Sequence, residues 1–170
     1  GTPVGPPARR GAAPGETGAA KPAAKAATSP GSFIPPMLCT LVAQPPAGEG
    51  WLHEIKFDGY RMEALVAGGA ARLITRNGKD WSARFPETTA ALAKLPDAVI
   101  DGELVAPDDR GNPDFAQLQA AMEEGTTDRL LFYAFDLLSE GKRSLLDETL
   151  AARKERLRTL LAKAPKSIVF

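Results

Sequence analysis

The sequence has very few of the residues that form disulfides and zinc sites. Its 170 residues include one cysteine, Cys39, and one histidine, His53. A single cysteine excludes a disulfide within the chain, and one histidine beside it is too small a set for a Cys/His zinc site. Disulfide-stabilised scaffolds and structural zinc domains are therefore excluded.

Long hydrophobic runs and net charge are also absent. No apolar run approaches the roughly 20 residues that cross a membrane, and the first residues lack the hydrophobic stretch of a signal peptide. The 21 basic residues balance 21 acidic ones, so no global field attracts nucleic acid. The sequence predicts a cytoplasmic protein without membrane contact, in which any contact with nucleic acid is made by local basic patches. One such patch contains Arg72, Arg76, Lys79 and Arg84.

The first 31 residues differ in composition from the rest. They contain no aromatic residue and consist almost entirely of Gly, Ala, Pro, Thr, Ser, Lys and Arg. Such a stretch buries too little apolar surface to offset its chain entropy. We therefore predict a disordered Ala/Pro-rich linker over residues 1–31 and a folded domain over residues 32–170. Because the chain lacks an initiator methionine and stops within the apolar run 167–170, we expect it to be a fragment with further modules fused to it.

Hydrophobic periodicity predicts an α+β domain. Strands are expected over residues 51–56, 60–67, 71–76 and 130–138, the last of them fully buried, with a β-branched run over 98–105. Gly68 and Gly69 indicate a hairpin between two of these strands. Helices are expected over 85–94, around the shared face of Phe115, Leu118 and Met122, and over 149–162. Strands dominate the middle of the chain and helices occur singly, which favours antiparallel sheets with packed helices.

The run from His53 to Arg61 contains the strongest chemical signal. It places Lys56 between Glu54 and Asp58, directly before a glycine and an arginine. A neutral lysine amine can attack phosphorus, but its ordinary pKa is about 10.4. Neighbouring carboxylates raise that pKa, whereas burial or a nearby cation lowers it. A nucleophilic role for Lys56 therefore requires a divalent cation and a triphosphate beside it.

This run is the first of four motifs that occur in a fixed order. Together they resemble the adenylation domain of ATP-dependent DNA ligases, closest to the ligase module of bacterial DNA ligase D, and the likeness covers about residues 33–170. Any one motif is weak, but four in order at plausible spacing are strong support. The motifs are Glu54-Ile55-Lys56-Phe57-Asp58-Gly59-Tyr60-Arg61, Thr75-Arg76-Asn77-Gly78-Lys79-Asp80-Trp81, Asp101-Gly102-Glu103-Leu104-Val105 and Phe132-Tyr133-Ala134-Phe135-Asp136-Leu137-Leu138.

The resemblance implies a role for each of seven residues. Lys56 takes AMP from ATP as a lysyl phosphoramidate, and Glu54 and the backbone of Ile55 contact the adenine edge. Arg61 and Arg76 hold nucleotide and DNA phosphates, as forked guanidinium groups can. The remaining two are Glu103, which contacts the ribose or the catalytic metal, and Phe135, which stacks on adenine. On pattern alone, Phe135 and Phe132 would both be core residues, and the resemblance separates them.

The resemblance also implies a fold and partners. We expect a nucleotidyltransferase (ATP-grasp-like) fold that is incomplete at its C-terminus, because the family's later motifs, with a glutamate and paired lysines, are not found after Leu138. The implied cofactors are ATP and Mg²⁺ or Mn²⁺. The implied partners are nicked or broken double-stranded DNA and a Ku-like end-binding protein, which would place the enzyme at the bacterial nucleoid. The resemblance does not imply that this chain alone can adenylate itself or seal DNA.

Two alternatives remain open on the sequence. One is an RNA ligase or a capping-type guanylyltransferase, which nucleotide choice would distinguish. The other is a non-catalytic nucleic-acid-binding remnant of the fold. The missing later motifs favour this remnant, and the intact set of Lys56, Asp58, Gly59 and Arg61 opposes it.

Overall fold

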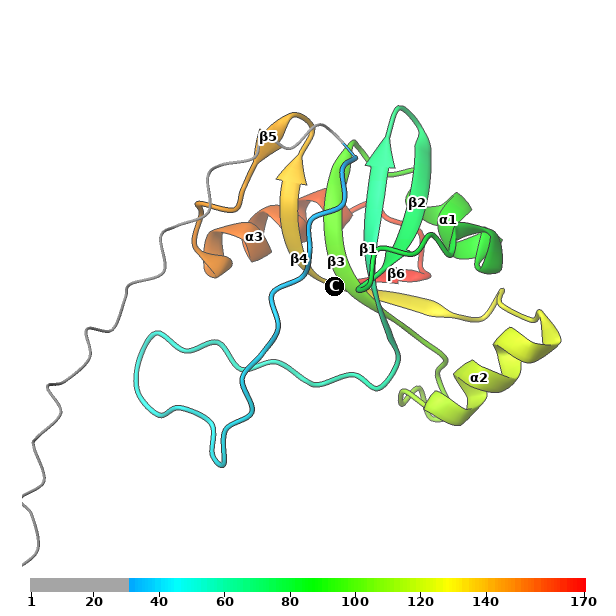
Figure 1. Cartoon of the computed structure of the whole chain (residues 1–170), viewed down its shortest axis with the longest axis horizontal. Helices are drawn as coiled ribbons and strands as arrows, with labels where there is room; N and C mark the ends of the chain where they lie inside the picture. Colours follow the sequence, from blue (N-terminus) through cyan, green and yellow to red (C-terminus); the bar gives the residue numbers. More distant parts are fainter. Residues whose placement is uncertain (1–30) are drawn as a thin grey trace, which may run out of the picture.

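The centre of the molecule is one six-stranded sheet. The computed structural model describes residues 31–170, so the linker predicted over residues 1–31 lies, apart from Gly31, outside the described residues. The strand order is β2-β1-β3-β4-β5, and β6 pairs with β4 (Figure 1). The strands are β1 (Tyr60–Ala67), β2 (Ala70–Thr75), β3 (Ala98–Val105), β4 (Leu131–Glu140), β5 (Arg143–Ser144) and β6 (Ile168–Val169). All pairs are antiparallel except β4 with β6. The predicted α+β class is confirmed, with one mixed sheet in the described residues.

Helices and turns begin and end where local chemistry favours it. The helical segments are η1 (Ser82–Arg84), α1 (Pro86–Leu92), α2 (Phe115–Glu124) and α3 (Leu150–Leu161). Pro86 occupies the first turn of α1, where a missing amide hydrogen costs nothing. The Asp114 side chain accepts from two amides at the start of α2, and Gly125 ends that helix in the left-handed conformation. Gly68 and Gly69 form the predicted hairpin turn with positive φ angles of 59° and 76°.

The two faces of the sheet are covered by different parts of the chain. Side chains of β1, β3 and β4 on one face join α1, α2 and α3 in the main core, which includes Leu92, Leu118 and Leu157. In Figure 1, α1 and α3 lie behind the sheet and the first described residues cross in front of it. There Phe33 and Ile34 pack against a smaller cluster formed by Leu65, Ile74, Val99 and Leu138. The front face is therefore apolar at one end only.

Two of the predicted elements are wrong. Residues 51–56 form a loop rather than a strand, and every one of them is exposed. A strand requires a hydrogen-bonding neighbour, and none of the strands described in residues 31–170 pairs with this segment. Strand β4 is also not fully buried: its inner and outer residues alternate, with Phe132 and Ala134 inside and Tyr133 and Phe135 half-buried. Because the sequence of this strand is almost continuously apolar, it gave no sign that Tyr133 and Phe135 face outward.

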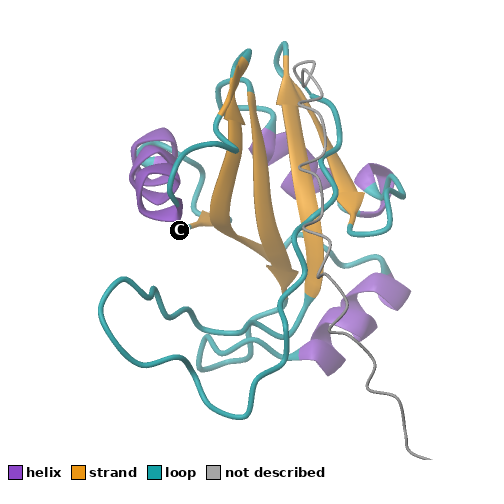
Figure 2. Cartoon of the chain, turned by 60° about the vertical axis from the view of Figure 1, so that its left-hand side comes forward, coloured by secondary structure: helices purple, strands orange, loops and turns teal. Residues whose placement is uncertain are grey.

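The loop that precedes β1 extends away from the sheet. Residues 37–56 are all exposed, and Figures 1 and 2 both show this segment leaving the sheet and returning at the start of β1. It contains seven large hydrophobic side chains at the surface: Met37, Leu38, Leu41, Val42, Trp51, Leu52 and Ile55. No helix among residues 31–170 has the length and apolarity needed to cross a membrane.

Candidate functional site

Arg61 lies on the front face of the sheet and is held from several sides. Its Nε and Nη2 donate to the two carboxylate oxygens of Asp101 at 3.1 and 2.6 Å, and its Nη1 donates to the carbonyl of Met37 at 3.2 Å. The guanidinium carbon is 5.5 Å from the centre of the Phe135 ring. The hydrogen bond with Asp101 raises the pKa of Arg61 above its ordinary value. The guanidinium is therefore fixed in place, and three of its five N–H groups are used in these contacts, which leaves two for an anion.

Glu103 connects the sheet to the loop that contains Lys56. It lies opposite Arg61 in the register of β1 with β3, and its side chain packs closely against Gly59. Burial raises the pKa of Glu103, and the Gly59 amide and the charges of Arg61 and Lys56 oppose that rise. The Lys56 ammonium is thus within electrostatic reach of Glu103. Both residues were predicted as site residues, and the structure places them in one neighbourhood.

Two motif glycines are required by close packing. A Cβ on Gly59 would lie 2.3 Å from the carbonyl oxygen of Leu104, and one on Gly102 would lie 2.4 Å from Cζ of Phe132 and 2.6 Å from the carbonyl oxygen of Tyr133. Neither glycine has a positive φ angle, so the constraint is steric. Gly59 lets the loop approach β3, and Gly102 lets β4 and the Phe132 ring approach β3. The motifs contain glycine because backbone and aromatic atoms occupy the space of a side chain.

The side chains of β4 alternate between its two faces from Phe132 to Phe135, where a β-bulge interrupts the pairing with β3. The pairing of β3 with β4 runs from Asp101↔Asp136 to Gly102↔Ala134, which leaves Phe135 as the extra residue. Phe132 lies wholly in the main core, whereas Phe135 is half-buried beneath Arg61 on the front face. The two phenylalanines therefore occupy different environments, as the resemblance required.

The loop is held against the sheet on both sides of Lys56. After Lys56, the Phe57 ring stacks on Tyr133 of β4 with ring centres 4.3 Å apart. Before it, Glu54 forms an ion pair with Lys154 of α3. Lys56 itself is exposed, and Ile55 is 78% exposed. The structure thus places the nucleophile candidate on a loop that is held at its flanks and open at its centre.

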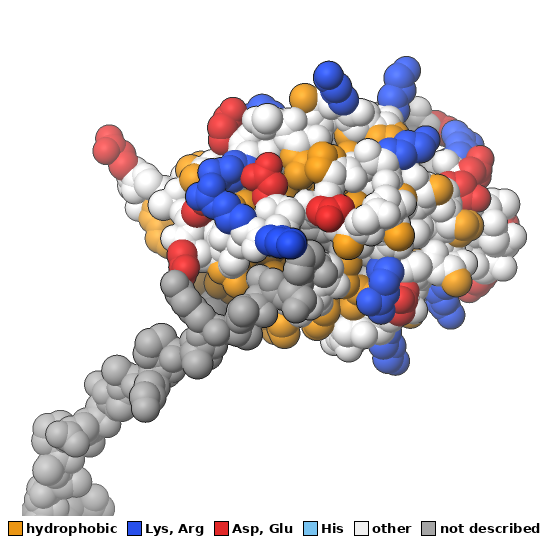
Figure 3. All heavy atoms as spheres, turned by 90° about the horizontal axis from the view of Figure 1, so that it is seen from above, with side chains coloured by type: hydrophobic (Ala, Val, Ile, Leu, Met, Phe, Trp, Pro, Cys, Tyr) orange, Lys and Arg blue, Asp and Glu red, His pale blue; other side chains and the backbone are white. Residues whose placement is uncertain are grey.

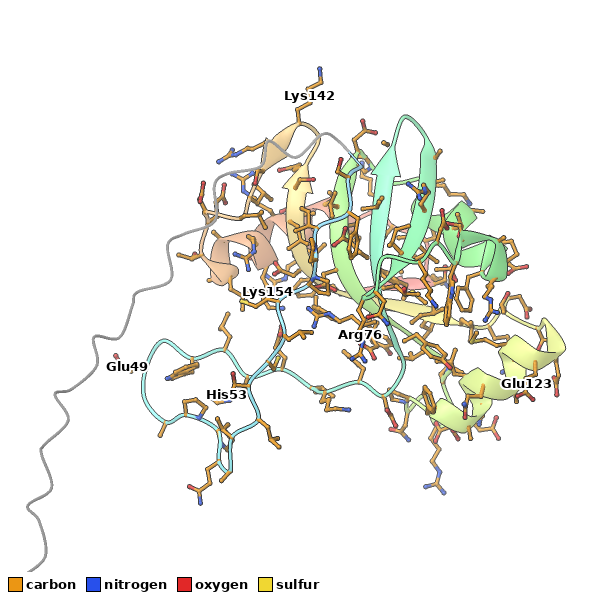
Figure 4. The ribbon with its side chains drawn as sticks, viewed as in Figure 1. Glu49, His53, Arg76, Glu123, Lys142 and Lys154 are labelled. Carbon is orange, nitrogen blue, oxygen red and sulfur yellow. The ribbon has the colours of Figure 1, made fainter. Side chains whose placement is uncertain are left out.

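Arg76 lies beside the start of β1, where Arg61 is, because its neighbour Thr75 pairs with Met62. It directly follows β2, is exposed, and lines a hollow of about 370 Å³ with Pro35, Pro36, Leu38 and Asn77. Figure 4 shows it at the lower end of the sheet.

Seen from above, the molecule has acidic and basic side chains interspersed, with no broad area of one sign on that face (Figure 3). The basic patch predicted around Arg76 is weakened by pairing, because Arg72 forms an ion pair with Asp80.

Glu63 is a buried carboxylate next to Asp101, and the sequence analysis predicted no role for it. It is 4% exposed and lies opposite Asp101 in the register of β1 with β3. One of its oxygens accepts from the amide of Ile34 at 2.8 Å, and the other, Oε2, is buried without a partner among the described residues. Burial raises the pKa of Glu63 to about 7. This residue therefore joins the first described segment to the sheet through a group that titrates near neutral pH.

The carboxylates do not form a metal cage by themselves. In residues 31–170 no group of three or more His, Cys, Asp or Glu side chains could hold a metal ion. Asp101 is already paired with Arg61, which leaves Glu103 as the other carboxylate of the third motif, within electrostatic reach of Lys56. One carboxylate fits a Mg²⁺ ion that arrives on the phosphates of a nucleotide, because Mg²⁺ commonly uses one or two carboxylates and substrate phosphates.

Comparison with known proteins identifies the family. Residues 36–170 match the family described as ATP dependent DNA ligase domain. The chain is 43% identical to the multifunctional non-homologous end joining protein LigD of Pseudomonas aeruginosa over 94% of the chain, and 40% identical to the LigD protein of Mycobacterium tuberculosis over 75%. It spans 18% and 17% of the length of these curated relatives. The chain belongs to the ATP-dependent DNA ligase domain family.

Solved structures agree with this assignment. The chain is similar to mycobacterial DNA ligase D complexed with ATP and MES, with a TM-score of 0.60 and 36% identity over 69% of this chain and 38% of that one. It is similarly close to the ligase domain of Mycobacterium tuberculosis LigD, with a TM-score of 0.59. The resemblance read from the four motifs is therefore confirmed at the level of family and fold.

Sequence reasoning gave no role to two residues that shape the site. Asp101 lies within the third motif, so its place beside Glu103 could have suggested a partner for Arg61. Lys154 lies in a helix with many charges and had no distinguishing signal: all four basic residues of α3 form ion pairs. Only the tertiary structure shows that Lys154, among these four, contacts the predicted site residues Glu54 and Phe135.

Proposed function

We propose that this chain is part of an ATP-dependent DNA ligase, in which Lys56 forms the covalent adenylate. The observation that supports this most is that Arg61 on the front face contacts Phe135 and pairs with Asp101 of the third motif, whose Glu103 is within electrostatic reach of Lys56. These contacts join motifs that are 40 residues or more apart in the sequence, as in the ion pair of Arg61 with Asp101. Family membership makes adenylation the chemistry to test first.

The reaction would proceed by three phosphoryl transfers. The neutral amine of Lys56 attacks the α-phosphorus of ATP, an N–P bond forms, and pyrophosphate leaves. A 5′-phosphate oxygen of DNA then displaces Lys56 and takes the AMP group. Finally the 3′-hydroxyl attacks the activated 5′-phosphate, which closes the strand and releases AMP. Such transfers depend chiefly on positioning and on charge neutralisation.

The residues on the front face suit these tasks. Phe135 offers an aromatic surface for the adenine ring, and Glu54 and the backbone of Ile55 would contact the adenine edge. Arg61, fixed by Asp101, would neutralise phosphate charge, and the exposed Arg76 would contact nucleotide or DNA phosphate. Glu103 would help to hold a divalent Mg²⁺ or Mn²⁺ ion or the ribose. When bound, the ion would supply positive charge next to the phosphates and to the Lys56 amine.

We infer the wider setting from the relatives. Those of Pseudomonas and Mycobacterium are named as multifunctional non-homologous end joining proteins. The corresponding substrates would be nicked or broken double-stranded DNA, and a Ku-like end-binding protein would be the partner at the bacterial nucleoid. The predicted linker over residues 1–31 and the short share of the relatives' length fit a chain that is fused to further modules.

Intact-mass spectrometry provides the test of this proposal. The full-length protein is incubated with ATP or GTP and Mg²⁺ or Mn²⁺, and the 170-residue chain is treated in parallel. We expect the full-length protein to gain one AMP group from ATP and none from GTP. A GMP adduct would favour a capping-type guanylyltransferase. An unchanged mass in every condition would favour a non-catalytic nucleic-acid-binding module.

A further inference from the structure

Lys154 contacts two of the predicted nucleotide-binding segments at once. Its Nζ donates to the backbone carbonyl of Phe135 at 2.8 Å and forms an ion pair with Glu54. Its side chain is only 18% exposed, which is unusual for lysine. Figure 4 shows Lys154 below α3, on the side where the loop containing His53 lies. One ammonium group therefore joins two segments. One is β4, where Phe135 is predicted to stack on adenine, and the other is the loop, where Glu54 is predicted to contact the adenine edge.

The helix that positions Lys154 is firmly fixed. The adjacent Arg153 donates to both carboxylate oxygens of Asp136 on β4 at 2.8 and 2.9 Å. Leu157, one turn further along, is fully buried in the main core. The Phe170 ring lies 5.7 Å from the Lys154 Nζ, which limits the space on its other side. The ammonium is thus a fixed point to which the exposed loop binds.

The loop has contacts with the sheet after Lys56 but needs one before it. Phe57 and Gly59 contact β4 and β3 on the downstream side. Upstream, residues 37–56 are all exposed. Met37 at their far end accepts from Arg61, and the Glu54 ion pair is the contact next to Lys56. We propose that Lys154 is a positioning residue that holds Glu54 beside Phe135 and so sets the approach of Lys56. This role rests on the proposed adenylation function.

The ion pair can be tested without ATP, by backbone ¹⁵N relaxation on the 170-residue chain. Lys154→Met removes the charge and retains the length of the side chain. We expect the order parameters of residues 52–55 to fall to below about 0.6, the range of flexible segments. Glu54→Gln should produce the same change from the other side of the ion pair. The matched control is Lys142→Met, at the exposed β4–β5 turn (Figure 4), which should leave these values unchanged.

The positioning role is tested by adenylation kinetics in the full-length protein. Lys154→Met should raise the KM for ATP about tenfold and reduce the preference for ATP over GTP, with a smaller effect on kcat. Lys154→Arg, which keeps a cation at this place, should stay within about threefold of wild type. A purely structural role would lower the thermal midpoint and leave KM and nucleotide preference unchanged.

The outcomes separate this proposal from the proposed function. If the wild-type protein accepts no AMP, the proposed function fails, while the order parameters still decide whether Lys154 holds the loop. Unchanged order parameters in Lys154→Met would overturn the inference. So would a rigid-to-flexible change in the loop with unaltered KM and nucleotide preference, because Lys154 would then hold the loop without positioning the site.

Discussion

The predicted site is divided between a rigid region and an exposed one. Arg61, Glu103 and Phe135 lie on strands whose opposite face is the main core, and each is at least half-buried or paired. Glu54, Ile55 and Lys56 lie on a loop in which every residue from 37 to 56 is exposed. The strand residues are placed by packing and register, whereas the loop residues are placed by a few polar and aromatic contacts. The groups proposed to stack on adenine and to neutralise phosphate are thus placed by the sheet, whereas the reacting group and the residues proposed for the adenine edge lie on the exposed loop.

This difference suits a covalent nucleophile. A lysine that must meet ATP and then present AMP to DNA needs an accessible amine, whereas a binding platform needs order before the ligand arrives. The contacts on either side of Lys56, from Phe57 to Tyr133 and from Glu54 to Lys154, restrict the loop without burying the amine. The following predictions test this division, from the largest expected effect to the smallest.

The largest effect is expected at the exposed nucleophile. In the full-length protein, Lys56→Ala should abolish labelling by ATP, since no other lysine lies in the motif. Lys56→Arg should fail equally, because a guanidinium stays protonated and cannot attack phosphorus. Labelling is followed with radioactive ATP, and Lys142→Arg serves as the control. Persistence of labelling in either Lys56 variant would remove this residue from the mechanism.

A comparison of two phenylalanines tests the rigid region. Phe132 is fully buried, so Phe132→Ala should lower the free energy of unfolding by about 3–5 kcal/mol through the cavity it leaves. Phe135→Ala should cost the unliganded fold less and remove base stacking worth roughly 1–3 kcal/mol of ATP binding. Phe135→Leu should restore part of that affinity.

Denaturant unfolding and ATP titration measure these two quantities separately. The assignment of Phe135 to adenine is wrong if Phe135→Ala destabilises the fold as much as Phe132→Ala does. It is also wrong if Phe135→Ala leaves the ATP affinity unaltered.

Stability should depend on pH through Glu63. Its pKa rises from 4.5 in the unfolded chain to about 7 in the fold, so its contribution is fully present below about pH 4.5 and is lost as the pH rises through 7. At about 1.4 kcal/mol for each pKa unit, the loss over this shift is on the order of 3–4 kcal/mol. Glu63→Gln should therefore gain stability relative to wild type as the pH rises from about 4.5 to about 7, the window set by the two pKa values.

Chemical unfolding at several pH values measures this difference. The exposed Glu123 on α2 supplies the control, Glu123→Gln, which should show no such trend. A stability difference between Glu63→Gln and wild type that stays constant with pH would refute a titrating Glu63.

The smallest effect is expected from the first 30 residues. Their composition offers few side chains that could bury apolar surface, so their deletion should leave the thermal midpoint nearly unchanged. Differential scanning calorimetry of the two chains measures this, and limited proteolysis should cut after Arg9, Arg10, Lys21 or Lys25 first. A fall of several degrees would show that the segment docks on the domain.

Local patterns were enough to predict most elements of the sheet. The strand at residues 60–67 alternates and its hairpin contains two glycines, so its bounds were predicted as found. The helices likewise begin at a proline or after a side chain that caps their amides. Prediction failed at residues 51–56, because an apolar alternating run forms a strand only where another strand offers hydrogen bonds. That condition depends on the rest of the fold.

The sequence by itself determined the family and predicted which residues form the site, because both depend on residue types at fixed spacing. The four motifs that contain Lys56, Arg76, Glu103 and Phe135 follow one another in a fixed order along the sequence. Only the tertiary structure decided which groups meet. The pairing of Arg61 with Asp101, the bulge at Phe135 and the contact of Lys154 with Glu54 arise from strand register and helix packing between residues that are far apart in sequence, and no local pattern encodes those distances.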